Sequence, residues 1–377
     1  MNIFTVTMTP INPPYDDGAK NIVLGIANHI KNHNFYFISA FTRRFKAGSN
    51  ISFIFSPFQG VGMHSMAFFQ KIYITLIILL RIQKIDILQF FFTPQMYFSK
   101  IFGNLVKRYN KKSIQIVSSV HTLFKKNSAE IIPALFFADY TITHSDYTKN
   151  LLTVLGVKNV LKVYPGIEFS RFRANPLGRK SNDLTVLYAG TYKILKESYS
   201  FEEFYEISRI VCGNIENLKF IMACRIRSKE DRLYEKTFKK LVEKNNLLQH
   251  FIFLNTVEDM PSLINNCSVG IMPSRNQMSG VLEIPLVLLE LAAMEKPVIY
   301  SAIEPFNELA DKGLGVCLND MSAQKYAETI LDILKDRNLY DNISRDSKDA
   351  VMKHFDIEKT AIEYQKIYAD LEKNNYE

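Results

Sequence analysis

The sequence lacks tryptophan and contains few cysteines. The four cysteines are far apart, which excludes a disulfide framework and a cysteine-based metal site and favours a reducing, cytoplasmic location. They are Cys212, Cys224, Cys267 and Cys317. The apolar run from Ile72 (IYITLIILL) is stopped by Arg81 and is too short to span a bilayer. The first residues, MNIFTVTMTP, are typical of a strand and a turn and not of a signal peptide.

Acidic residues are scarce in the first half of the chain. Met1–Gly178 carries 20 Lys and Arg against 7 Asp and Glu, a net charge of +13, whereas the remainder carries 26 against 31, a net charge of −5. This asymmetry predicts two domains with different partners. The basic clusters of the first half lie near many phenylalanines; they are Arg43-Arg44-Lys46, Lys107-Arg108 and Lys111-Lys112.

These basic clusters leave three alternatives open. They suit an anionic membrane surface or another anionic acceptor. They are also compatible with a basic surface that is merely solvated. Nucleic acid is the weakest reading, because the sequence has no recognised nucleic-acid motif and no Gly/Arg-rich arm, so we expect no nucleic-acid partner.

A regular alternation of apolar strands and helices fills the 377 residues. Strands are expected at 3–8, 35–41, 50–58, 86–92, 113–120, 140–145 and 160–166, and again at 184–190, 218–224, 251–256, 268–274, 297–301 and 314–318. Helices are expected at 19–32, 63–83, 95–109, 146–155, 201–211, 228–245, 259–266, 285–295 and 305–311. The alternation predicts the α/β class, with parallel sheets covered on both faces. The stretch 166–183 has few aliphatic residues and contains Pro, Gly and Ser, which indicates a hinge.

One acidic residue lies inside an apolar helix of the second half. The segment IPLVLLELAAME has Glu290 in its middle, Glu283 just before it, and Pro285 where we expect the first turn. A carboxylate in such a helix needs a partner, because burying it unpaired costs several kcal/mol. Glu290 therefore either pairs with a backbone group or a lysine, or lies at the carboxyl edge of a parallel sheet and accepts hydrogen bonds from sugar hydroxyls, with Glu283 beside it.

Several segments occur in an order and spacing that identify a family. They are ADYTITHSDYTKNLL from Ala138, VYPGIEFSRF from Val163, VLYAGTYKILKES from Val186, FIFLNTVEDMPSLINNCSVGIMPS from Phe251 and EIPLVLLELAAMEKPVI from Glu283. Together they resemble the GT-B-fold glycosyltransferases of the family-four (glycosyl transferases group 1) type, over nearly the whole chain. The resemblance implies two Rossmann-like domains facing across a cleft, with a C-terminal helix that crosses back to the first domain.

The resemblance also implies an activity. Residues 1–170 would bind the acceptor, 183–355 would bind the nucleotide sugar, and 356–377 would pack back on the first domain. The reaction would move a sugar from a nucleotide-sugar donor to the hydroxyl of a saccharide or lipid-linked acceptor, with retention and with neither a metal nor another cofactor. The setting would be polysaccharide, lipopolysaccharide or glycolipid synthesis in the cytoplasm, or peripherally on the inner membrane face. The alternatives are another GT-B activity, an epimerase or a phosphorylase, and a catalytically inactive nucleotide-sugar-binding protein.

Site residues follow from the resemblance by position. A leaving nucleoside diphosphate needs cations and helix N-termini when no metal is present. The family's loop lysine matches Lys196, and its loop arginine falls at Thr191, whose lost charge Lys193 could supply. The family's ribose-binding glutamate matches Glu290, and its first glutamate would fall on Leu282, one residue before Glu283. The expected catalytic residues are His121, Lys196 and Glu283; the expected donor-binding residues are Gly18, Thr191, Lys193, Lys196, Ser274, Glu283 and Glu290.

Each of these residues also has a plainer interpretation. Lys193 and Lys196 could be ordinary exposed loop lysines. A histidine at a strand end, as His121 is, is more often structural, and His144 is expected to serve packing. The adjacent acids Asp16 and Asp17 lack further ligands at metal-binding spacing, so we expect no metal site there.

Overall fold

The computed structural model describes residues 1–7, 11, 18–39, 48–55, 68–117, 123–124, 127–175, 184–226, 228–275 and 284–373. The chain forms two compact units. The first unit contains the described residues up to Gly166, Ile284, and those from Ile357 onward. The second unit contains the described residues from Ile167 to Arg275 and from Pro285 to Asp356.

The first unit is built on a parallel sheet of seven strands in the order β3-β2-β1-β4-β5-β6-β7. The strands are β1 (Asn2–Thr7), β2 (Asn34–Ser39), β3 (Ile51–Phe55), β4 (Ile87–Phe91), β5 (Lys112–Ile116), β6 (Tyr140–Thr143) and β7 (Val160–Lys162). The helices are α1 (Gly18–His29), α2 (Phe68–Arg81), α3 (Met96–Arg108), α5 (Asp146–Val154) and α14 (Ile357–Lys373), with the 3-10 turns η1 (Ile82–Lys84) and η2 (Ile132–Leu135). All five residues of β4 are buried, as expected for a central strand covered on both faces.

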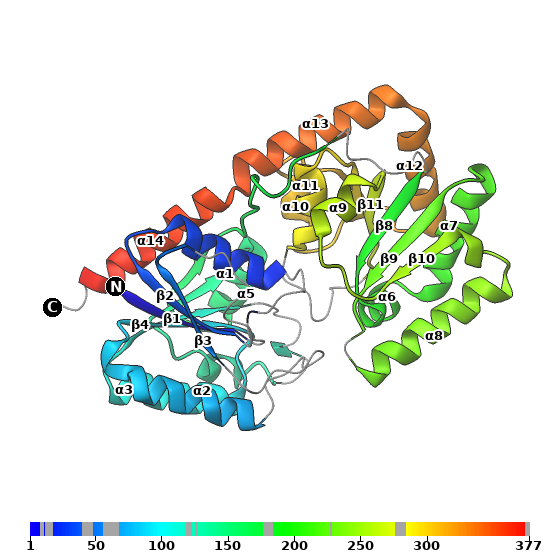
Figure 1. The fold of residues 1–377 in the computed structure, drawn as a ribbon. Helices are drawn as coiled ribbons and strands as arrows, with labels where there is room; N and C mark the ends of the chain where they lie inside the picture. The colour runs from blue at the N-terminus through cyan, green and yellow to red at the C-terminus, as the bar shows by residue number, and fades with distance from the viewer. Residues whose placement is uncertain are drawn as a thin grey trace. The chain divides into compact units, whose positions relative to one another are not determined.

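Helices cover both faces of this first sheet. In Figure 1, α1 and α14 lie on one face and α2 and α3 lie on the other. The last helix packs against α1, so the expected return of the C-terminal helix to the first unit is observed. Three hydrogen bonds attach α14: the Thr360 hydroxyl donates to the Tyr164 carbonyl at 3.0 Å, the buried Tyr368 hydroxyl donates to Gln89 at 2.5 Å, and the Tyr140 hydroxyl donates to Asp370.

The second unit is built on a parallel sheet of six strands in the order β10-β9-β8-β11-β12-β13. The strands are β8 (Thr185–Gly190), β9 (Lys219–Cys224), β10 (Phe251–Leu254), β11 (Val269–Met272), β12 (Val298–Ser301) and β13 (Val316–Leu318). The helices are α6 (Tyr192–Ser198), α7 (Phe201–Asn214), α8 (Lys229–Lys244), α9 (Met260–Asn265), α10 (Leu286–Ala293), α11 (Asn307–Ala310), α12 (Ala323–Lys335) and α13 (Arg337–His354), with the 3-10 turn η4 (Leu248–His250).

The core of the second unit is rich in phenylalanine. Phe238 of α8 lies within 6 Å of the ring centroids of Phe201, Phe204 and Phe251. On other parts of the sheet, α12 packs against α7, and α10 packs against α9 and α13. The predicted α/β class and the two parallel sheets are confirmed. Within the described ranges, no helix has both the length and the apolarity needed to cross a bilayer.

Candidate functional site

The strand order of the second sheet contains a switch point. From the central strand β8 the chain moves outward to β9 and β10, then returns to the other side of β8 and moves outward through β11, β12 and β13. In sheets of this kind, ligands bind outside the carboxyl ends of the two strands where the direction reverses. The carboxyl ends of β8 and β11, at Gly190 and Met272, therefore mark the candidate site.

Glu290 lies on the helix that follows β11. Seven of the eight residues of α10 are buried, and the Glu290 side chain is only 5% exposed. The sequence predicted this helix from its apolar run, but it predicted Pro285 inside the first turn. Pro285 instead precedes the helix with φ −65° and ψ 115°, and its carbonyl accepts the N–H of Leu288 at 3.1 Å. Among the described residues, no side chain caps the N-terminus of α10.

The close approach of α10 to β11 depends on one glycine. A Cβ atom added at Gly270 would lie 2.2 Å from Cδ1 of Leu291, which is closer than real carbon contacts allow. Leu291 is the neighbour of Glu290 on α10 and is 1% exposed. Glycine at position 270 therefore allows the helix to pack directly on the strand, and this packing fixes the position of Glu290 relative to the end of β11.

Ser274 lies just beyond the carboxyl end of β11 and is fully buried. Its backbone N–H donates to Oγ of Ser301 at 2.8 Å, and that oxygen lies 2.8 Å from the Tyr326 hydroxyl. These bonds join the ends of β11 and β12 to α12. Ser274, a predicted donor-binding residue, thus lies just beyond the carboxyl end of β11 within a hydrogen-bonded framework.

Arg275, which sequence reasoning missed, follows Ser274 at the switch point. Its backbone N–H donates to the carbonyl of Ser198 at 2.6 Å, which ties the end of β11 to the last turn of α6. Its guanidinium pairs with Glu203 and lies 5.6 Å from the ring centroid of Tyr199. The side chain is 46% exposed. The signal for Arg275 in the sequence was its position directly after the Pro-Ser pair that ends the predicted strand.

The segment after β8 was expected to be a loop, and that expectation is wrong. Tyr192–Ser198 forms the short helix α6, and Thr191 is its N-cap. The Thr191 Oγ1 accepts the N–H of Ile194 at 3.1 Å, which is the normal bond of a threonine cap. The tertiary contacts of Tyr192 and Leu195, which are both buried, hold a seven-residue helix that would not persist alone.

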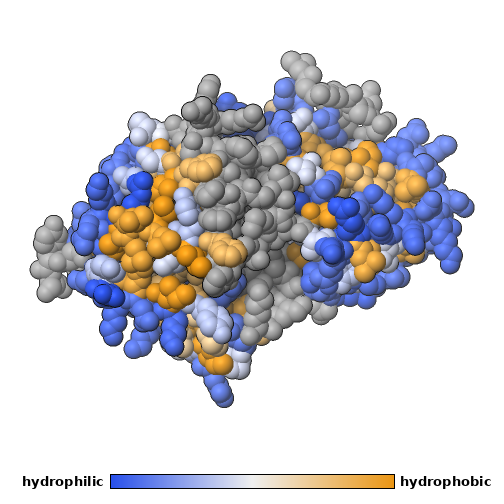
Figure 2. Space-filling view, turned by 60° about the horizontal axis from the view of Figure 1, so that its bottom comes forward, coloured by the Kyte–Doolittle hydropathy of each residue, from blue (hydrophilic) through white to orange (hydrophobic). Residues whose placement is uncertain are grey.

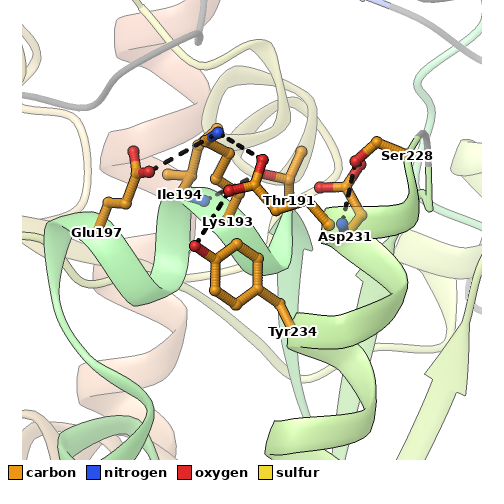
Figure 3. A network of polar contacts seen from close by, with 8 residues as sticks. Thr191, Lys193, Ile194, Glu197, Ser228, Asp231 and Tyr234 are labelled. Atoms are coloured by element: carbon orange, nitrogen blue, oxygen red, sulfur yellow. Dashed lines mark hydrogen bonds and ion pairs between the residues drawn. The ribbon is translucent and has the colours of Figure 1, made fainter.

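Lys193 lies in a network of polar contacts between α6 and α8 (Figure 3). Its Nζ is 2.8 Å from Oε2 of Glu230 and 3.8 Å from Oε1 of Glu197. The Tyr234 hydroxyl donates to the other oxygen of Glu230 at 3.3 Å. The hydrogen bond to Glu230 raises the pKa of Lys193 above its ordinary value. Because α8 follows β9, this ammonium lies toward β9 and not toward the switch point.

A second ion pair joins Lys196 of α6 to Glu202 of α7. The Lys196 Nζ lies 3.2 Å from Oε2 of Glu202 and 5.3 Å from the ring centroid of Phe201. A backbone hydrogen bond at Glu202 itself and the Lys196 ammonium lower the pKa of Glu202. Both lysines are thus partly exposed residues of a helix, each engaged with an acidic side chain.

The remaining predicted residues are distributed as follows. Gly18 is the first residue of α1 in the first unit. Within the second unit, α6 carries Lys193 and Lys196, β11 leads to Ser274, and α10 carries Glu290. The strand β11 links these elements through the contacts of Gly270 and Arg275. His121, Glu283, Asp16 and Asp17 lie outside the described residues.

Of the residues considered for a metal site or for a histidine role, His144 lies within the described part of the chain. In that part, no cluster of three His, Cys, Asp or Glu side chains could hold a metal ion. His144 is fully buried; its Nδ1 lies 3.0 Å from the Val163 carbonyl, and its ring lies 6.0 Å from that of Phe91. Burial lowers the pKa of His144 to about 4, so this histidine is neutral inside the first unit.

Comparisons with known proteins show a similarity to one family over part of the chain and a fold over nearly all of it. Residues 173–350 match the family model for glycosyl transferases group 1. An uncharacterized glycosyltransferase of Methanocaldococcus jannaschii is 25% identical over 286 residues, which cover 71% of this chain and 72% of that protein.

Solved structures extend the likeness to both units. Sucrose-phosphate synthase from Thermosynechococcus elongatus superposes with a TM-score of 0.77 at 15% identity, covering 98% of each chain. The Anabaena protein HepE, solved in complex with UDP and glucose, superposes with a TM-score of 0.74 at 12% identity, covering 98% of this chain and 99% of that one. The second unit is therefore similar to the glycosyl transferases group 1 family over residues 173–350, and the chain's two Rossmann-like units have the GT-B fold.

Proposed function

We propose that this protein transfers a sugar from a nucleotide-sugar donor to an acceptor hydroxyl, and that the second unit holds the donor beside the carboxyl ends of β8 and β11. The observation that carries this proposal is the buried Glu290 carboxylate on α10, a helix packed directly on the switch-point strand β11. A carboxylate can accept hydrogen bonds from the two neighbouring hydroxyls of a ribose. Its position is fixed when core packing holds the helix that carries it. The UDP present in the HepE structure supports a nucleotide as the ligand of this fold.

The charges near the switch point support transfer to an acceptor by the protein's own cations. In the reaction, the bond between the anomeric carbon and the diphosphate oxygen breaks, a bond to the acceptor oxygen forms, and the acceptor proton leaves. The departing diphosphate gains negative charge, which the N-terminus of α10 would stabilise, and Arg275 would add its charge only by leaving Glu203. Lys196 reaches the same role only by leaving Glu202, and Lys193 only by leaving Glu230.

We further propose that transfer retains the anomeric configuration, requires no metal or other cofactor, and takes place in the cytoplasm. Four free cysteines support a reducing compartment. His121 and Glu283 stay predicted catalytic residues, and Gly18 and Thr191 stay predicted donor contacts. Activity that survives EDTA, and an NMR spectrum with the donor's anomeric configuration in the product, are the expected results; loss of activity with EDTA, or inversion, would contradict these two points.

A catalytically inactive nucleotide-sugar-binding protein is the second candidate. It is favoured by Thr191 at the position of the family's arginine and by the ion pairs that occupy both lysines. A thermal-shift screen of nucleoside diphosphates and nucleotide sugars comes first, since a ligand at ~100 times its Kd stabilises its site by ~2.7 kcal/mol. Slow donor hydrolysis in the absence of acceptor then supports the transferase. Stabilisation with neither hydrolysis nor transfer would support the inactive alternative, and no stabilisation by any nucleotide would contradict both.

A further inference from the structure

The first turn of α7 contacts a cation from each of the two segments that follow the switch-point strands. Lys196 lies on α6, which follows β8, and its Nζ is 3.2 Å from Oε2 of Glu202. Arg275 follows β11, and its guanidinium pairs with Oε1 of Glu203. Glu202 and Glu203 are neighbours in the first turn of α7, and we call them the α7 carboxylate pair. One helical turn therefore holds both cations.

Ion pairs by themselves are ordinary features of a protein surface. Hydrophilic residues dominate the surface of the second unit in Figure 2, around smaller apolar areas. On α7 itself, Glu206 and Arg209 form another exposed pair at 2.6 Å, and such pairs add little to stability. The α7 carboxylate pair differs in its partners, because these are cations that a departing diphosphate would need. Its contacts therefore bear on ligand binding more than on stability.

The arrangement that holds the two cations carries two energetic costs. Ser200, the N-cap of α7, has φ 125° and ψ 154°, a region rarely adopted by residues other than glycine. Its N–H donates to the Leu195 carbonyl at 3.0 Å and its Oγ accepts the N–H of Glu203 at 3.1 Å, which keeps the turn between α6 and α7 in this conformation. Oε2 of Glu203 is shielded from solvent and accepts no hydrogen bond from the described residues. Both costs are reduced when the cations leave α7.

We propose that the α7 carboxylate pair competes with the phosphates of the ligand for Lys196 and Arg275, and that the strained turn at Ser200 assists the exchange. This inference rests on the proposed function and concerns regulation of that same site. A nucleoside diphosphate gains two contacts with cations only by breaking two ion pairs, so the net gain is small. The carboxylates recover their cations when the ligand leaves. The pair therefore lowers the affinity for the nucleoside diphosphate and favours release of this product of the transfer.

Isothermal titration tests the competition directly. The probes are UDP, GDP, ADP and dTDP, each with its monophosphate and its nucleoside. Glu202→Gln and Glu203→Gln are each expected to lower the Kd of the diphosphate that binds by about two- to fivefold, and the double variant by about tenfold, because the ligand no longer breaks an exposed ion pair. The matched control Glu206→Gln removes the same charge from α7 and is expected to bind like wild type.

Two further readouts separate competition for the cations from a change in the shape of the site. Binding of the nucleoside is expected to be unchanged in the double variant, because a nucleoside brings no phosphate to either cation. The Kd of the diphosphate is expected to rise more steeply with salt in the double variant than in wild type. In wild type, phosphates replace carboxylates, so the number of ion pairs hardly changes on binding, whereas in the variant each contact with a phosphate is an additional ion pair.

The substitution Ser200→Gly tests the contribution of the strained turn. Glycine adopts a φ of 125° without the steric cost of a Cβ atom, so the variant is expected to have a higher Tm. Because the paired arrangement is then more stable, the diphosphate is expected to bind about twofold more weakly. In a protein that already carries Glu202→Gln and Glu203→Gln, the same substitution is expected to leave the Kd unchanged.

The possible failures are distinguishable. A nucleoside diphosphate that binds wild type and the double variant with equal affinity would overturn this inference and leave the proposed function standing. Equal tightening for the nucleoside and the diphosphate would overturn it as well, because the effect would not act through the cations, and so would tighter diphosphate binding by Ser200→Gly. If none of the four diphosphates binds wild type or any variant, both this inference and the proposed function fail.

Discussion

Replacing Gly270 with alanine tests how α10 is held on β11. The new methyl group would lie 2.2 Å from Cδ1, 3.2 Å from Cγ and 3.3 Å from Cδ2 of Leu291. Leu291 is 1% exposed and cannot move into solvent, so α10 must shift or Leu291 must adopt a strained rotamer. Overpacking of this kind costs about 1–3 kcal/mol, which lowers the Tm of a unit of this size by roughly 2–10 °C.

A second genetic background separates this clash from a general loss of stability. In a protein that already carries Leu291→Ala, the added methyl group enters the space left by the leucine, and Gly270→Ala is expected to be neutral or stabilising. Gly213→Ala is the matched control, because Gly213 lies within α7 and a Cβ there meets no atom within 4 Å. The control is expected to stabilise by roughly 0.5–1 kcal/mol.

Chemical denaturation of wild type and these four variants gives the free energies of unfolding, and nucleotide titration reports on the position of Glu290. The Gly270→Ala protein is expected to bind nucleoside diphosphate more weakly, because Glu290 moves with its helix. A Gly270→Ala protein as stable as wild type, or one whose destabilisation is unchanged in the Leu291→Ala background, would refute the close packing of α10 on β11.

Three further predictions follow from individual side chains. Lys196→Ala is expected to lower turnover roughly a hundredfold, the scale of losing one contact to a developing charge; turnover near wild type would make Lys196 a surface residue paired with Glu202. Arg275→Gln is expected to weaken binding of a nucleoside diphosphate roughly tenfold while leaving binding of the nucleoside unchanged; equal losses for both ligands would place Arg275 away from the diphosphate. Stability is expected to fall by ~2 kcal/mol between pH 7 and pH 5, because the buried His144 has a pKa of about 4 and the unfolded imidazole, near 6.5, binds its proton first. Denaturation of His144→Asn at both pH values checks this; an undiminished pH dependence would assign it to other groups.

Local sequence patterns predicted the elements that build the site. SVGIMPS indicated a buried strand, and β11 is Val269–Met272. The apolar run after Pro285 indicated a buried helix, and α10 is Leu286–Ala293. Both predictions succeeded because a parallel strand and the helix that covers it need continuous apolar residues, a requirement that is visible along the chain.

Contacts between distant segments could not be predicted in the same way. The helix α6 is short and partly polar, and its stability comes from buried contacts of Tyr192 and Leu195. The partner of Lys193 is Glu230, which lies 37 residues further along the chain on α8. The role of Arg275 depends on the strand order that places β11 beside β8. Each of these features is a product of tertiary packing, for which the sequence alone gives no distance.

The central claim is that Glu290 binds the nucleotide of the donor. Isothermal titration of a nucleoside diphosphate into wild type, Glu290→Gln and Glu295→Gln tests it most directly. Glu295 is an exposed carboxylate just beyond the same helix, paired with Lys348 at 2.6 Å, and serves as the matched control. Because charge-assisted hydrogen bonds are worth about 1.5–3 kcal/mol, Glu290→Gln is expected to raise the Kd roughly tenfold or more while Glu295→Gln binds like wild type. A folded Glu290→Gln protein with unchanged affinity would contradict the claim.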